Sequence, residues 1–109
     1  MLEKDPDLSR CVMALQACHA GCLRSIAHMS NNETKGISAY PVVSMLDCAE
    51  ICQLAISFLM RESDHYVRIC LEVIEICRDI ILRCEGLTDM DGVVHICLQC
   101  ISACRKIVS

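Results

Sequence analysis

The sequence predicts an all-α protein: a single antiparallel up-down-up-down four-helix bundle, residues 1–109, in which cysteines line the core. Three observations support this. Four segments carry apolar residues at helical spacing. Apolar residues make up 54% of the chain and aromatic residues 3%, whereas strands are usually enriched in aromatic residues. The cysteines recur three, four and seven residues apart, which places them on one face of a helix.

The first helix is expected over about residues 6–29. Asp5 is a suitable N-cap, and Pro6 suits the first helical position. At about 100° per residue, the apolar positions form one inward stripe. That stripe contains Leu8, Cys11, Leu15, Cys18, Cys22 and Met29. The polar stretch 30–40 is expected to be the one long connection.

The second helix is expected over about 41–61 and the third over about 64–85. Pro41 begins the second helix, and Ser63 is a suitable N-cap for the third. The turn between them is short, so the two helices are predicted to be antiparallel neighbours. The inner stripe of the second helix contains Met45, Cys48, Cys52, Ala55 and Leu59, and that of the third contains Cys70, Cys77 and Cys84.

The fourth helix is expected over about 89–107. Gly86 stands where the third helix must turn into the left-handed region, and Thr88–Asp91 is similar to a capping box with Asp in place of Glu. Two of the three connections are short, which favours helices that alternate in direction. The inner face contains Met90, Val93, Val94, Cys97, Cys100, Ile101, Cys104 and Val108.

Charge and composition exclude several classes of partner. The net charge is −4, the basic residues are scattered and aromatic residues are few, so we expect no nucleic acid partner. Charged residues interrupt the apolar runs before the roughly 20 residues that a membrane span requires, so no membrane is expected. The start of the chain lacks the basic and apolar stretches of a secretory signal, which predicts a cytoplasmic protein.

The eleven cysteines are expected to be reduced. The cytosol keeps thiols reduced, eleven is an odd number, and cysteines on one helical face point side by side. Isolated core cysteines need no function, because cysteine packs as a small hydrophobe. Eleven are hard to explain by packing alone, because Ile, Leu and Val pack better and do not oxidise. The cysteines therefore indicate a ligand.

Cysteine spacing favours Cu(I) as that ligand. A structural zinc site is typically built from two short Cys pairs, and here Cys97–Cys100 is the one CxxC, inside a predicted helix. The loops and successive CxxC steps of iron–sulfur motifs are absent. Pairs one helical turn apart suit a soft ion of low coordination number, and at most about one Cu(I) could bind per cysteine. The candidate ligands are Cys11, Cys18, Cys22, Cys48, Cys52, Cys70, Cys77, Cys84, Cys97, Cys100 and Cys104.

From about Asp5 to Ile107, this pattern of inward CxxxC and heptad cysteines on four amphipathic helices resembles the copper storage proteins. The resemblance implies many Cu(I) ions along the bundle axis, a homotetramer and a cytosolic location. Several inward positions depart from the richest members because they are not cysteine, and these limit the capacity. They are Leu15, Ser25, Ala55, Ile74, Ile81, Val94 and Ile101.

One end of the bundle is predicted to be the mouth for copper. An antiparallel arrangement places Met29, Met45, Met90 and Cys84 at the same end, with His28 beside them. Thioether and imidazole ligands there would suit capture and transfer of Cu(I). The copper storage proteins that this pattern resembles similarly carry Met and His near their open end. The simpler interpretation is that the methionines fill gaps in packing.

The sequence predicts no enzyme. It contains no G-x-S-x-G, no H-E-x-x-H and no phosphate-binding loop, and buried thiols without an activating group are unreactive. The function predicted is cytosolic Cu(I) storage or buffering, with copper ions and a copper donor or acceptor protein as partners. Two alternatives stay open: a thiol redox buffer or sensor, and a zinc-binding or purely structural bundle.

Overall fold

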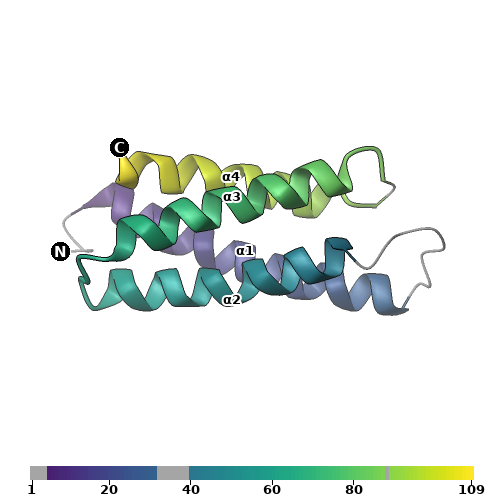
Figure 1. Cartoon of the computed structure of the whole chain (residues 1–109), viewed down its shortest axis with the longest axis horizontal. Helices are drawn as coiled ribbons and strands as arrows, with labels where there is room; N and C mark the ends of the chain where they lie inside the picture. Colours follow the sequence, from purple (N-terminus) through teal and green to yellow (C-terminus); the bar gives the residue numbers. More distant parts are fainter. Residues whose placement is uncertain (1–4, 32–39, 88) are drawn as a thin grey trace.

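The computed structural model describes residues 5–31, 40–87 and 89–109, which form four α-helices running alternately up and down (Figure 1). They are α1 (Pro6–Asn31), α2 (Tyr40–Met60), α3 (Tyr66–Cys84) and α4 (Asp91–Val108). Each helix packs against two neighbours, α1 and α3 both lying between α2 and α4. The molecule measures 46 × 20 × 19 Å. The predicted all-α four-helix bundle is confirmed.

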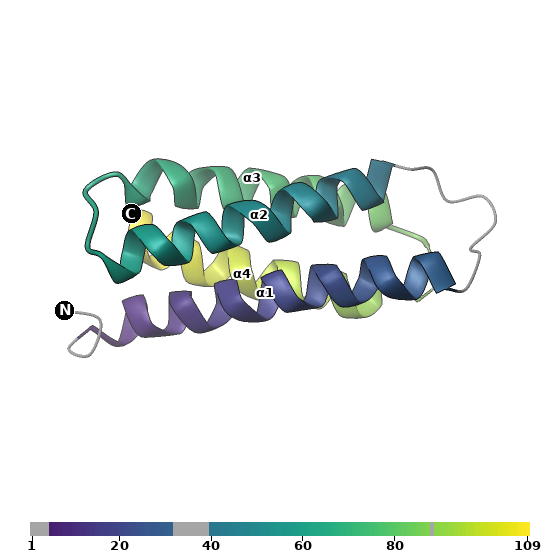
Figure 2. The same ribbon diagram turned by 90° about the horizontal axis from the view of Figure 1, so that it is seen from below.

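The two ends of the bundle differ in the connections they carry. The α2–α3 turn lies at the same end as the start of α1 and the end of α4 (Figures 1 and 2). We call this the closed end. The end of α1, the start of α2, the end of α3 and the start of α4 lie at the opposite end, which we call the mouth.

Helix boundaries at the closed end agree with the prediction for α1 and differ for α3. The Asp5 carboxylate accepts hydrogen bonds from the backbone N–H groups of Asp7 and Leu8, at 3.0 and 3.4 Å, which confirms it as a cap. The third helix begins at Tyr66, two residues later than predicted. The reason is that Glu62 adopts a left-handed φ of 56° to reverse the chain, and Ser63 caps this turn through the N–H of His65.

At the mouth, Gly86 has a φ of +76°, which confirms the predicted left-handed position after α3. The fourth helix begins at Asp91, and its N-cap is Met90, whose side chain makes no capping hydrogen bond. The predicted capping box starts at Thr88, which lies outside the described residues.

The core consists of the cysteine-bearing stripes of all four helices. Every cysteine is at most 2% exposed. The inward positions Leu15, Ala55, Ile74 and Ile101 are buried as predicted, whereas Ser25, Ile81 and Val94 are half-buried. At the last two positions the preceding residues, Ile80 and Val93, are buried instead. Near the mouth, the buried stripes of α3 and α4 therefore include residues one position earlier than predicted.

Among the described helices, α2 is long and apolar enough to span a membrane by length and composition, over Pro41–Met60. Charge interrupts this segment at Asp47 and Glu50, as expected, but these two residues do not take it out of the length and composition range of a membrane span. Its apolar character has two sources. Cys48 and Cys52 face the core, while leucines such as Leu46 stay exposed on the outer face.

Candidate metal centre

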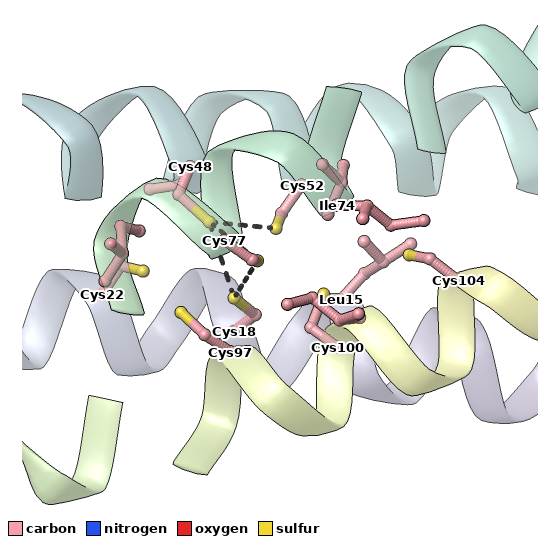
Figure 3. Packing of buried hydrophobic residues seen from close by; sticks show 14 of the residues in the cluster. Leu15, Cys18, Cys22, Cys48, Cys52, Ile74, Cys77, Cys97, Cys100 and Cys104 are labelled. Atoms are coloured by element: carbon pink, nitrogen blue, oxygen red, sulfur yellow. Dashed lines mark hydrogen bonds between the residues drawn. The ribbon is translucent and has the colours of Figure 1, made fainter. Parts of the chain in front are cut away.

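The thiols from all four helices meet along the bundle axis (Figure 3). All eleven cysteines are free and buried. Five pairs of sulfur atoms lie 3.6–3.9 Å apart, and four of them join different helices. The pairs are Cys11–Cys104, Cys18–Cys48, Cys18–Cys77, Cys48–Cys52 and Cys48–Cys77.

Cys18 lies at the centre of the largest group. Its sulfur belongs to two sets of three whose members all lie within 4.8 Å of one another, one with Cys48 and Cys77 and one with Cys52 and Cys100. The two sets together draw on all four helices. An ion bound by either set would share Cys18 with its neighbour, and thiolate bridging is a favourable arrangement for soft ions.

Cys22 and Cys97 extend this group toward the mouth. Cys22 forms hydrogen bonds with Cys18 and Cys48, which raise its pKa, and it also interacts with Cys97. Cys97 in turn interacts with Cys18, Cys48 and Cys77. We call the resulting group of seven thiols the central cluster; its members are Cys18, Cys22, Cys48, Cys52, Cys77, Cys97 and Cys100.

A second group lies at the closed end. The sulfurs of Cys11, Cys70 and Cys104 lie within 4.8 Å of one another, and those of Cys11 and Cys104 are 3.8 Å apart. We call these three residues the closed-end trio. Cys84 belongs to neither group: it is the last residue of α3, at the mouth, and burial raises its pKa with no contribution from another cysteine.

The thiols share protons within each group. Hydrogen bonds with Cys104 and Cys70, and then burial, raise the pKa of Cys11. Hydrogen bonds with Cys104 and Cys11 stabilise a thiolate at Cys70 and lower its pKa to about 4. In the central cluster, hydrogen bonds with Cys100 and Cys18 raise the pKa of Cys77. The arrangement favours a few thiolates surrounded by protonated thiols, so metal binding must displace the remaining protons.

The sulfur spacings suit metal–thiolate bonding. Taking a metal–sulfur distance of about 2.3 Å, two opposite thiolates are separated by about 4.6 Å, and three around one ion by about 4.0 Å. The observed spacings of 3.6–3.9 Å are closer to the three-thiolate value. Pairs that bind a linear ion would have to open by under about 1 Å, which side-chain rotation can supply.

The residues predicted for the mouth are gathered there. Met29 is 7% exposed and lies near the end of α1, Met45 is fully buried in the early turns of α2, and Met90 is 1% exposed at the start of α4. They lie at the same end of the bundle as Cys84 (Figure 1). His28 is exposed, and with Met90 and Arg24 it lines a cavity of about 330 Å³ between α1 and α4.

Three polar contacts between helices, made by His19 and Ser44, were missed in the sequence. His19 on α1 donates its Nδ1–H to the carbonyl of Ala49 on α2, at 2.8 Å, and its Nε2 accepts from Gln53 at 3.3 Å. Ser44 donates to the Asp79 carboxylate, which links α2 to α3 and lowers the pKa of Asp79. The position of His19 in the sequence gives no indication of the Ala49 partner.

Comparisons with known proteins agree with this geometry. The family model for copper storage proteins matches residues 4–109. A crystal structure of a protein from Nitrosospira multiformis superposes with a TM-score of 0.88 at 33% sequence identity, covering 96% of this chain and 97% of that one. No curated protein matches the chain. Because the family match spans nearly every residue and the fold is a cysteine-lined bundle, the chain belongs to the copper storage protein family.

Proposed function

We propose that the protein stores or buffers Cu(I) in the cytosol, holding several ions per chain on its core cysteine thiolates. The proposed ligands are all eleven cysteines. The role is binding and release of copper, with no catalytic step.

One observation carries the proposal: ten of the eleven cysteine sulfurs form one connected network inside the bundle. Thiolates select soft ions such as Cu(I), and bridging lets neighbouring ions share sulfurs. The surrounding aliphatic core excludes water, and burial of free thiolates without a counter-charge would be costly. Cu(I) supplies that charge. Loading should therefore release protons and weaken as the pH falls.

We assign capture and transfer of copper to Met29, Met45, Met90 and His28 at the mouth. Support comes from their position at the same end as Cys84 and from the cavity that His28 and Met90 line. Thioethers bind Cu(I) more weakly than thiolates do, so an ion would pass from weaker to stronger ligands as it moves inward. A copper donor or acceptor protein would act at this end.

We also propose that the chain assembles into a homotetramer, as the family resemblance implies. The support is a set of apolar side chains left exposed on the outer faces of α2 and α3. Leu46 and Leu54 on α2 are 46% and 43% exposed, and Leu71 and Leu82 on α3 are 48% and 69% exposed. Sedimentation velocity on the reduced protein tests this assembly: a monomer at micromolar concentration would contradict it.

Anaerobic titration of the reduced protein with Cu(I), against a competing chromogenic chelator, tests the proposed function. We expect more than about four ions per chain to be held against the competitor, because the two thiol groups offer ten connected ligands. Fewer than about four would exclude storage. Parallel titration with Zn(II) should show weaker and less extensive binding.

A thiol redox function is the second candidate, and one observation favours it. Cys18 and Cys48 bring their sulfurs to 3.6 Å across α1 and α2, and Cys11 and Cys104 reach 3.8 Å across α1 and α4. Reversible disulfides between these helices under mild oxidation, together with no preference for Cu(I), would support this alternative over storage.

A further inference from the structure

Two apolar side chains stand between the central cluster and the closed-end trio. Leu15 and Ile74 lie between Cys18 and Cys104 along the bundle (Figure 3). They are 0% and 4% exposed. On α1, Leu15 lies between Cys11 and Cys18, and on α3, Ile74 lies between Cys70 and Cys77. At this one level along the bundle axis, α1 and α3 therefore both present a hydrocarbon side chain in place of a thiol.

Sulfur contacts across this level are restricted to one helix. The sulfurs of Cys11, Cys70 and Cys104 lie within 4.8 Å of one another, and no such set of three among the described cysteines combines one of them with a cysteine of the central cluster. Cys104 also interacts with Cys100, one turn earlier on α4. On α2, Ala55 is the next inward residue after Cys52, so it continues the core toward the closed end without a sulfur. Among the described residues, Cys100–Cys104 is the one sulfur step that joins the groups.

The trio is also shielded on its other side. Leu59 is 5% exposed at the closed end, and Leu8 and Tyr66 are partly buried against the core. The Tyr66 hydroxyl donates to the carbonyl of Ile107 at 3.4 Å, joining α3 to α4 there. With Asp5, Glu62 and Asp64, these three side chains line a cavity of about 290 Å³ at the closed end, so hydrocarbon separates an ion bound by the trio from that cavity.

The spacing of the trio fits one ion held by three thiolates. Such an ion separates its sulfurs by about 4.0 Å when the metal–sulfur distance is about 2.3 Å. All three sulfurs lie within 4.8 Å of one another, and the Cys11–Cys104 pair is at 3.8 Å. Soft ions such as Cu(I) and Ag(I) are the class that three thiolates select.

From this arrangement we infer that the metal store has two compartments: the central cluster, and a closed-end site in which Cys11, Cys70 and Cys104 hold one Cu(I) behind the Leu15–Ile74 barrier. The inference rests on the proposed copper-binding function. Ions reach and leave the closed-end site through the Cys104–Cys100 step. The protonated thiols of the trio lose their protons to solvent as the ion binds and regain them on release.

Removal of Cu(I) from the fully loaded protein by excess chromogenic chelator tests the division. We expect a fast phase and a slow phase, with the slow phase accounting for about one ion per chain. Cys70→Ser should abolish the slow phase. Cys22→Ser, a matched loss of one thiol from the central cluster, should reduce the fast phase and leave the slow one.

The barrier is tested by placing a sulfur in it. Ile74→Cys should accelerate the slow phase at least tenfold, because it adds a second sulfur step between the groups. Ile74→Val keeps a hydrocarbon there and should leave the rate within about twofold. Helicity of each variant is checked by circular dichroism. Leu59→Ala thins the hydrocarbon at the closed end but adds no sulfur, so it should accelerate the slow phase less than Ile74→Cys does.

Three outcomes would overturn the division: release of all ions in one phase, a slow phase that persists in Cys70→Ser, or a slow phase accelerated by Leu59→Ala but not by Ile74→Cys. Failure of the proposed function looks different. In that case the protein would not retain Cu(I) against the competing chelator at all, and no release could be followed.

Discussion

The sulfur of Cys18 on α1 lies 3.6 Å from that of Cys48 on α2, which is the shortest of the thiol contacts in the core. This pair joins the two helices that the long connection separates, and Cys18 is also the residue shared by two sets of three sulfurs. The centre of the bundle therefore depends on one thiol more than on any other.

Loss of Cys18 should therefore reduce the copper capacity more than loss of an isolated thiol. We expect Cys18→Ser to lose about two ions per chain, because both sets of three become pairs. Cys84→Ser is the matched control and should lose at most one. Equal losses in the competitive titration would show that the sets are not shared through Cys18.

The reduced, metal-free protein should lose stability as the pH rises above about 9. Folding raises the pKa of eight thiols above the ordinary value of 9.0, so above that pH the unfolded chain releases protons that the folded chain keeps. Cys18, Cys48 and Cys70 have lowered pKa values and act in the opposite direction while the thiols of the unfolded chain titrate, but they are three thiols against eight. The eight are Cys11, Cys22, Cys52, Cys77, Cys84, Cys97, Cys100 and Cys104.

Urea denaturation at pH 8 and pH 10 measures this effect. The free energy of unfolding should be lower at pH 10. Cys77→Ser removes one of the raised thiols and should narrow the difference between the two pH values. An unchanged or larger free energy of unfolding at pH 10 in the parent protein would contradict the prediction.

Replacing Met29, Met45 and Met90 together with leucine should slow Cu(I) uptake and leave the capacity nearly intact. Leucine and methionine are close in volume, so the expected cost in stability is under about 1.5 kcal/mol for each substitution. The control is Met13→Leu with Met60→Leu, since these two side chains are 67% and 60% exposed. If stopped-flow uptake is equally fast in both variants, the mouth methionines serve only in packing.

Gly21 allows α1 and α4 to approach closely, and its replacement should be coupled to Ile96. A Cβ added at Gly21 would lie 2.6 Å from the Cδ1 of Ile96, whereas one at Gly92 meets nothing within 4 Å. Alanine normally stabilises a helix by about 1 kcal/mol relative to glycine. Gly21→Ala should therefore fail to show this gain in the free energy of unfolding. Gly92→Ala is the control and should not destabilise the protein.

A double-mutant cycle isolates the Gly21 contact. Ile96→Val removes Cδ1, so Gly21→Ala should be better tolerated in that background by about 1 kcal/mol. Chemical denaturation of the four proteins gives the coupling. Additive effects would show that α1 and α4 adjust to the extra carbon without strain.

The fold and the inward cysteines could be predicted from the sequence because helical periodicity is a local property. Cys70, Cys77 and Cys84 share a stripe whatever the other helices do, and all three are buried. The start of α3 could not be predicted as well. Ser63 is a good cap by type, but it is used in the turn that precedes Tyr66.

Relationships between helices were the part that the sequence could not supply. The inward position of Leu15 and Ile74 was predictable, but their common level between two thiol groups depends on how α1 and α3 are displaced along the axis. The contact between His19 and Ala49 depends in the same way on the register of α1 against α2.

X-ray absorption at the copper edge of the fully loaded protein tests the central claim most directly, because every cysteine in the chain is buried. The account predicts Cu(I), with sulfur as the dominant donor and several ions per chain. Cu(II), or a first shell dominated by nitrogen and oxygen, would place the copper on surface groups and would contradict storage on the core thiolates.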